Sequence, residues 1–148
     1  RGTMRKALVV DDSKAVRMIL GRTLRELGFE VFEAANGVEA LRLIEENKNS
    51  VELVLADWNM PEMNGMELLK ILRQDQDLSS LVVLMVTTET ELPKMAAALE
   101  AGANEYVMKP FTKDILIHKL QLVGIHPQGG ESSNRGSGSG CWLWTTQS

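Results

Sequence analysis

The chain has 148 residues, a length that fits one domain with a sizeable core. Hydrophobic residues make up 44%, charged residues 24%, and the formal net charge is −4, which argues against nucleic acid or an anionic membrane as the main partner. The single cysteine, Cys141, excludes an internal disulfide and a cysteine-based zinc site. With no secretory segment and no run long enough to span a bilayer, we expect a cytoplasmic protein.

The two ends of the chain differ in composition from the rest. Residues 1–3, which precede Met4, look like a cloning remnant. From residue 128 onward glycine and serine dominate, and a CWLW segment follows at 141–144. We therefore place the domain at residues 4–127. We interpret 128–148 as a flexible artificial extension, with a tethered peptide ligand anchored by its tryptophans as the alternative.

Apolar runs alternate five times with amphipathic segments along the domain. The expected strands cover residues 6–10, 29–35, 51–56, 81–86 and 105–108. The first helix is expected to start after Ser13 and stop at Gly28, the second to follow Asn36-Gly37, and the third to carry residues 66–72. The fourth is expected to hold Pro93 in its first turn and to stop at Gly102. The fifth is expected to be capped by Thr112 and to have four inward residues: Ile115, Leu116, Leu120 and Val123.

This alternation is typical of βαβ units, which predicts an α/β fold with a parallel sheet and helices on both faces. In such a sheet all strands end at one edge, where open α/β folds bind their ligands. The residues at those ends are Asp11, Asp12, Asp57, Thr87 and Lys109. We therefore expect three carboxylates, a hydroxyl and an ammonium group to converge at that edge.

Such a cluster suggests phosphoryl chemistry. Three carboxylates repel one another unless a cation joins them, and their hard oxygen ligands suit Mg²⁺. Asp57 is the favoured nucleophile toward phosphorus, Asp11 and Asp12 hold the metal, and Lys109 and Thr87 contact the phosphoryl oxygens. Taken one at a time, each residue also has a plain interpretation, such as a helix cap, a strand-end threonine or a surface lysine.

Four motifs at these positions resemble the receiver domains of two-component response regulators, especially stand-alone CheY-like chemotaxis regulators. They are LVVDDS (8–13), LADWNMPEMNG (55–65), VLMVTTE (83–89) and AGANEYVMKPF (101–111). The similarity runs from about residue 4 to 124. It implies a flavodoxin-like, doubly wound sheet of five strands with five helices and the order 2-1-3-4-5, of which CheY is itself a standard example.

The resemblance also implies roles for individual residues. Asp57 accepts phosphate from a phosphohistidine on a sensor histidine kinase. Asp12, Asp57 and the backbone carbonyl of Asn59 bind Mg²⁺, and Asp11 acts mainly through water. Lys109 pairs with the phosphate.

Further implied roles concern switching and lifetime. Lys109 is followed by a cis Pro110. Thr87 moves toward the phosphoryl group on activation, and Tyr106 swings inward, which reshapes a partner surface. Asn59 and Glu89 flank the site and tune hydrolysis. Thr88 replaces a usually smaller residue, so its bulk is expected to slow both phosphorylation and hydrolysis.

The leading interpretation is thus a monomeric signalling switch that catalyses only its own phosphorylation and dephosphorylation, with a flagellar motor protein as the expected target. One alternative is an Mg²⁺-dependent phosphohydrolase with an aspartyl intermediate, which would want an acid where Asn59 stands. Another is a receiver-like scaffold that works without phosphate, which would be expected to lose Asp57, Lys109 or the aspartate pair.

Overall fold

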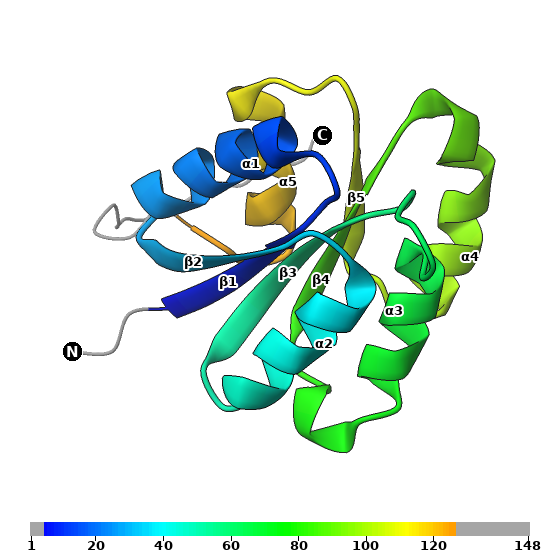
Figure 1. Cartoon of the computed structure of the whole chain (residues 1–148). Coiled ribbons are helices and arrows are strands. Elements are labelled where there is room, and N and C mark those ends of the chain that lie inside the picture. Colours follow the sequence, from blue (N-terminus) through cyan, green and yellow to red (C-terminus); the bar gives the residue numbers. More distant parts are fainter. Residues whose placement is uncertain (1–4, 127–148) are drawn as a thin grey trace.

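The computed structural model describes residues 5–126 and has a parallel five-stranded sheet at its centre, in the order β2-β1-β3-β4-β5 (Figure 1). The strands are β1 (Arg5–Val10), β2 (Phe29–Ala34), β3 (Val51–Asp57), β4 (Val82–Thr87) and β5 (Glu105–Met108). The α-helices are α1 (Lys14–Glu26), α2 (Gly37–Glu46), α3 (Gly65–Arg73), α4 (Met95–Glu100) and α5 (Lys113–Leu122), with 3₁₀ helices η1 (Gln76–Leu78) and η2 (Glu89–Lys94). The predicted flavodoxin-like fold is confirmed. The expected cloning remnant and the extension at 128–148 lie outside the described residues.

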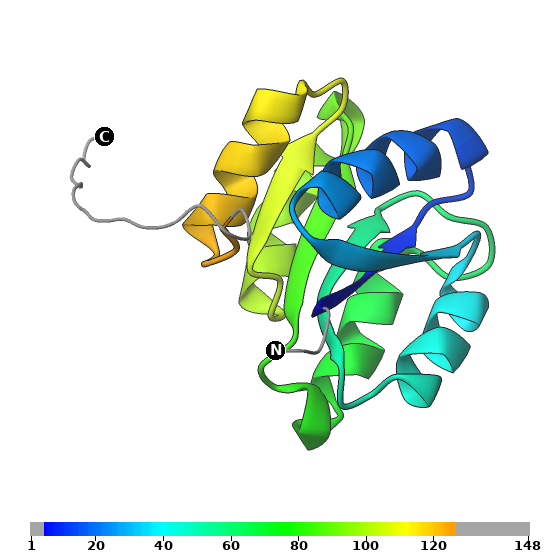
Figure 2. The same ribbon diagram turned by 90° about the vertical axis from the view of Figure 1, so that its left-hand side faces the viewer.

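The helices cover both faces of the sheet: α1 and α5 lie on one face, and α2, α3 and α4 on the other (Figures 1 and 2). Successive strand residues point to opposite faces, so each strand supplies two hydrophobic clusters. In β3, for example, Leu53 and Leu55 join the cluster under α1 and α5, while Val54 and Ala56 join the cluster under the other three helices. This double burial accounts for the unbroken apolar runs of the central strands.

Local capping signals place the helix starts. The Ser13 hydroxyl accepts a hydrogen bond from Val16 N, and Asn36 and Thr112 cap α2 and α5 in the same way. Gly28 follows α1 with a φ of 98°, a conformation that glycine adopts without a side-chain clash. The predicted boundaries at Ser13, Gly28 and Thr112 are confirmed, whereas α2 begins at Gly37, one residue earlier than predicted.

Two predictions about the helices were wrong, one about where α4 begins and one about the buried face of α5. Pro93 lies in η2, not in the first turn of α4, because Thr88 and Glu91 already cap a 3₁₀ helix that runs on to Lys94. Ile115 is 47% exposed rather than inward. Leu116 and Leu120, four residues apart, form the buried stripe of α5, and Ile115 lies off that stripe on the solvent side.

The far end of the sheet from the candidate site is held together by Arg73, at the end of α3. Its guanidinium donates to the carbonyl oxygens of Gly102 (2.9 Å), Leu78 (3.0 Å) and Leu81 (2.7 Å), and to Oδ1 of Asn104 (2.9 Å). Burial lowers the pKa of this arginine. One side chain thus joins the segment before β4 to the segment after α4.

Candidate functional site

Four of the predicted residues meet at the carboxyl edge of the sheet. Carboxylate oxygens of Asp11, Asp12 and Asp57 all lie within 4.8 Å of one another. The ammonium nitrogen of Lys109 lies 3.1 Å from Asp11 Oδ2 and 3.3 Å from Asp57 Oδ1. Asp11 and Asp57 are buried, at 1% and 5% exposure, whereas Asp12 is exposed. The inner part of the cluster is therefore buried, and the side formed by Asp12 is open to solvent.

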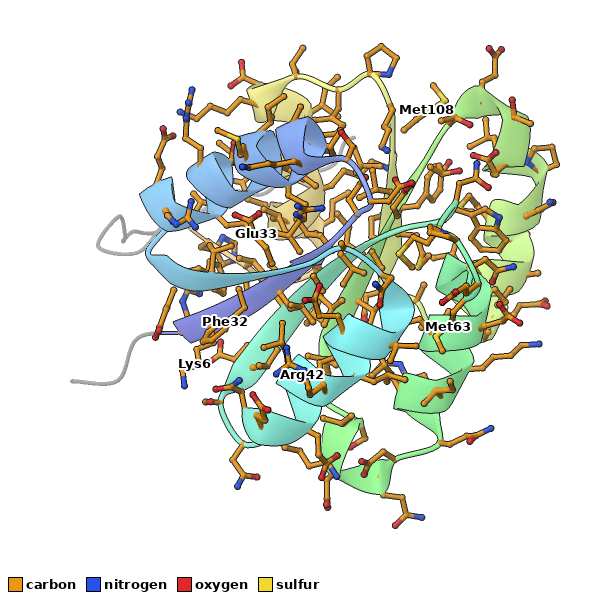
Figure 3. The ribbon with its side chains drawn as sticks, viewed as in Figure 1. Lys6, Phe32, Glu33, Arg42, Met63 and Met108 are labelled. Carbon is orange, nitrogen blue, oxygen red and sulfur yellow. The ribbon has the colours of Figure 1, made fainter. Side chains whose placement is uncertain are left out.

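Backbone and side-chain hydrogen bonds hold Asp11 in place at the end of β1. Its amide donates to the carbonyl of Ala34 (3.0 Å), and its Oδ1 accepts from the amide of Ser13 (2.8 Å). The guanidinium of Arg17 donates to the Asp11 carbonyl (2.6 Å) and pairs with Glu33 (3.1 Å), a residue of β2 that is labelled beside α1 in Figure 3. The first turn of α1 is thereby tied to the end of the edge strand β2.

Asp57 is the last residue of β3, one residue later than the predicted end of that strand. Trp58 N donates to the carbonyl of Val86 (2.9 Å), which ties this end of β3 to β4. Gly65 N donates to the Trp58 carbonyl (2.9 Å), so the start of α3 folds back against the same strand. A Cβ at Gly65 would lie 2.9 Å from the Asp57 carbonyl oxygen, so only glycine permits this approach.

The electrostatics of the cluster favour a bound cation. Burial and the neighbouring Asp11 carboxylate raise the pKa of Asp57 to about 6, although Lys109 acts in the opposite direction. Burial alone would lower the pKa of Lys109, but the carboxylates of Asp57 and Asp11 outweigh it and raise that pKa. One ammonium group does not compensate three carboxylates, so negative charge remains at the open side.

Thr87 and Tyr106 lie on the neighbouring strands. The Thr87 hydroxyl is buried and donates to the carbonyl of Thr88 (3.2 Å). The Lys109 amide donates to the Thr87 carbonyl (2.6 Å), and the Lys109–Pro110 peptide bond is cis. Tyr106 is partly exposed, and the ammonium of Lys119 lies 4.6 Å from its ring centre.

The residues that flank the cluster are joined by an acid that the sequence analysis did not single out, Glu91. Asn59 Nδ2 donates to Glu91 Oε2 (2.7 Å), while the Thr88 amide (3.1 Å) and the Thr88 hydroxyl donate to Glu91 Oε1. These bonds, the Thr88 hydroxyl first, lower the pKa of Glu91 although the carboxylate is buried. Glu89 is exposed. The spacing of Thr88 and Glu91 is the sequence signature of a capping box, but it does not predict the contact between Glu91 and Asn59.

Residues 7–121 match the family model described as the response regulator receiver domain. The chain belongs to this family. A receiver domain of this kind is the signalling module of two-component systems, and the expected family is thus confirmed.

Individual relatives of this receiver domain are chemotaxis proteins. It is 44% identical over 119 residues to chemotaxis protein CheY1 of Helicobacter pylori, covering 80% of this chain and 95% of the relative. It is 46% identical over 119 residues to a chemotaxis protein CheY homologue of Campylobacter jejuni, covering 80% and 91%. The solved structure of chemotaxis response regulator CheY4 of Vibrio cholerae superposes with a TM-score of 0.75 at 37% identity, covering 82% and 99%.

The donor set of this receiver domain fits Mg²⁺. Hard carboxylate oxygens converge from two strand ends, one of the three carboxylates is open to solvent, and no cysteine or histidine belongs to the cluster. An exposed face leaves room for the water ligands that Mg²⁺ keeps. Among the helices at residues 5–126, none is long and apolar enough to cross a membrane.

Proposed function

We propose that this receiver domain is a phosphorylation-controlled switch of the chemotaxis type, which accepts a phosphoryl group at Asp57 from a phosphohistidine of a sensor histidine kinase. The observation that carries the proposal is the Lys109 ammonium held between the buried carboxylates of Asp57 and Asp11 at the open edge of the sheet. Chemotaxis proteins are among its relatives, at 44–46% identity over most of their length.

In the transfer, an oxygen of the Asp57 carboxylate bonds to phosphorus while the phosphorus–nitrogen bond to the histidine breaks. The imidazole leaves with that electron pair and takes up a proton from solvent. The Lys109 ammonium and the Thr87 hydroxyl donate to phosphoryl oxygens and offset their charge. Asp12, Asp57 and the Asn59 carbonyl would hold Mg²⁺, with Asp11 acting through water, and the bound ion would supply positive charge to the same oxygens.

Phosphorylation reaches the partner surface through Thr87. Its hydroxyl donates to the Thr88 carbonyl, a bond that must break before the hydroxyl can turn to a phosphoryl group. The segment after β4 moves with Thr87, which lets Tyr106 turn inward from its place beside Lys119. The surface formed by α4, β5 and α5 then changes shape, which is how a downstream protein reads the signal.

The expected target is the flagellar motor switch, in the cytoplasm, and the domain is expected to act as a monomer. It also removes its own phosphoryl group, so the signal is transient, with Asn59, Thr88 and Glu89 near the site setting its lifetime. Catalysis is confined to the domain's own phosphorylation and dephosphorylation.

Trp58 reports on the site in a direct test, because it adjoins Asp57 and is buried. The full chain carrying Trp142→Phe and Trp144→Phe leaves Trp58 as the single tryptophan. We expect its fluorescence to change when Mg²⁺ is added and again when beryllofluoride, a phosphoryl mimic, follows. Asp57→Asn in the same background is the control and should abolish the second change. A folded wild type that responds to neither would refute the switch and favour the scaffold interpretation.

A further inference from the structure

The Glu91 carboxylate is buried on a short surface helix, and both of its oxygens are occupied. Its exposure is 6%, and it accepts three hydrogen bonds from neutral donors. Two of these donors belong to Thr88, three residues earlier, and form a local capping box that explains Oε1. The third is the side-chain amide of Asn59, two residues after the end of β3. A helix cap does not account for that contact.

The bond to Asn59 selects the direction of its amide. An ionised carboxylate only accepts hydrogen bonds, so the Asn59 atom that faces Glu91 must be the NH₂ group. The carbonyl oxygen Oδ1 is then the opposite end of the amide. Asn59 is exposed, and within residues 5–126 no hydrogen bond engages that oxygen. The backbone amide of the same residue is close enough to the Asp57 carboxylate to lower its pKa, which places Asn59 near the phosphoryl-acceptor group.

We propose that Glu91 is a positioning residue for loss of the phosphoryl group: it orients the Asn59 amide so that Oδ1 accepts a hydrogen bond from the attacking water. This inference rests on the proposed function. In the step, the water oxygen bonds to phosphorus, the bond between phosphorus and the Asp57 oxygen breaks, and the carboxylate leaves with the electron pair. Both water protons remain on the released dihydrogen phosphate. The role of Asn59 is to orient water, and Glu91 acts through it.

Glu91→Gln separates the cap from the contact with Asn59. A glutamine still accepts from Thr88 through its carbonyl oxygen, because glutamine serves in capping boxes as glutamate does. Its NH₂ group then faces Asn59, whose amide must turn over to accept. The NH₂ end of Asn59 replaces Oδ1 at the open side, and an NH₂ group cannot accept a hydrogen bond from water.

The experiment uses the full chain with Trp58 as its single tryptophan. The protein is phosphorylated with acetyl phosphate and Mg²⁺, the donor is removed, and the first-order loss of the phosphoryl group is followed by fluorescence and by gel. We expect Glu91→Gln to slow this loss at least threefold, with little change in the midpoint of urea unfolding. Asn59→Ala should slow it as well, and Glu91→Gln should add nothing in the Asn59→Ala background. Glu100→Gln, an exposed acid on α4, is the charge-matched control.

Two results would overturn the inference: an unchanged rate in Glu91→Gln, or an effect of that substitution that persists in full when Asn59 is alanine. A separate measurement distinguishes its failure from that of the proposed function. The NH₂ resonances of Asn59 in NMR spectra of the unphosphorylated protein should shift in Glu91→Gln. If wild type accepts neither phosphate nor beryllofluoride but these resonances do shift, the hydrogen bond between Glu91 and Asn59 exists in solution. The phosphorylation switch is then refuted, and with it the role of Glu91 in loss of the phosphoryl group.

Discussion

Replacing Asp57 by asparagine should stabilise the unphosphorylated domain, and the gain should depend on pH. In the folded protein, burial and the Asp11 carboxylate raise the pKa of Asp57 to about 6, whereas an ordinary aspartate has a pKa of about 3.9. Between these two values the folded state binds a proton that the unfolded chain does not. The stability of wild type therefore falls as the pH rises through that interval.

The size of the effect follows from the same interval. Each pH unit contributes about 1.4 kcal/mol, so wild type loses up to about 3 kcal/mol relative to Asp57→Asn between pH 4 and pH 7. The asparagine carries no charge and avoids this loss, while Lys109 keeps its ion pair with Asp11. We expect Asp57→Asn to be the more stable protein at pH 7 to 8 in the absence of divalent metal.

Urea unfolding in EDTA at five pH values from 4 to 8 measures this difference. Asp77→Asn, which removes an exposed carboxylate, is the control. Adding Mg²⁺ at pH 8 should stabilise wild type and leave Asp57→Asn almost unchanged. A difference between wild type and Asp57→Asn that does not grow with pH would refute the argument that burial and Asp11 dominate over Lys109.

Three further substitutions test separate parts of the structure. Gly65→Ala should cost about 1–3 kcal/mol of unfolding free energy, because its Cβ would press on the Asp57 carbonyl; a smaller loss in urea unfolding would show that α3 can move away. Arg73→Ala should cost about 2–4 kcal/mol of unfolding free energy, since it leaves three partly buried carbonyls without their donor, and Arg73→Lys should recover only part of this in the same assay. Lys109→Ala should retain the fluorescence response of Trp58 to Mg²⁺ yet fail to switch partner binding on beryllofluoride; normal switching would contradict the role given to Lys109.

The sequence determined the fold because its signals are local and agree with one another. Five apolar runs separated by amphipathic segments imply parallel strands, and capping residues such as Ser13 and Thr112 mark where helices begin. A parallel sheet brings all strand ends to one edge, so the meeting of Asp11, Asp57 and Lys109 followed from the positions of these residues along the chain. The pairing order came from the family resemblance, because local patterns do not specify which strands are neighbours.

Contacts between segments that are remote in sequence could be read only from the folded protein. The raised pKa of Asp57 depends on its burial and on how near Asp11 lies compared with Lys109, quantities that a motif does not contain. The lifetime-tuning role of Glu89 stays a prediction, and only the tertiary structure shows that a different acid, Glu91, two residues later, contacts Asn59. The physical reason is that η2 coils the segment after β4 and directs Glu91 toward the end of β3; the direction of a side chain depends on the packing of the whole fold.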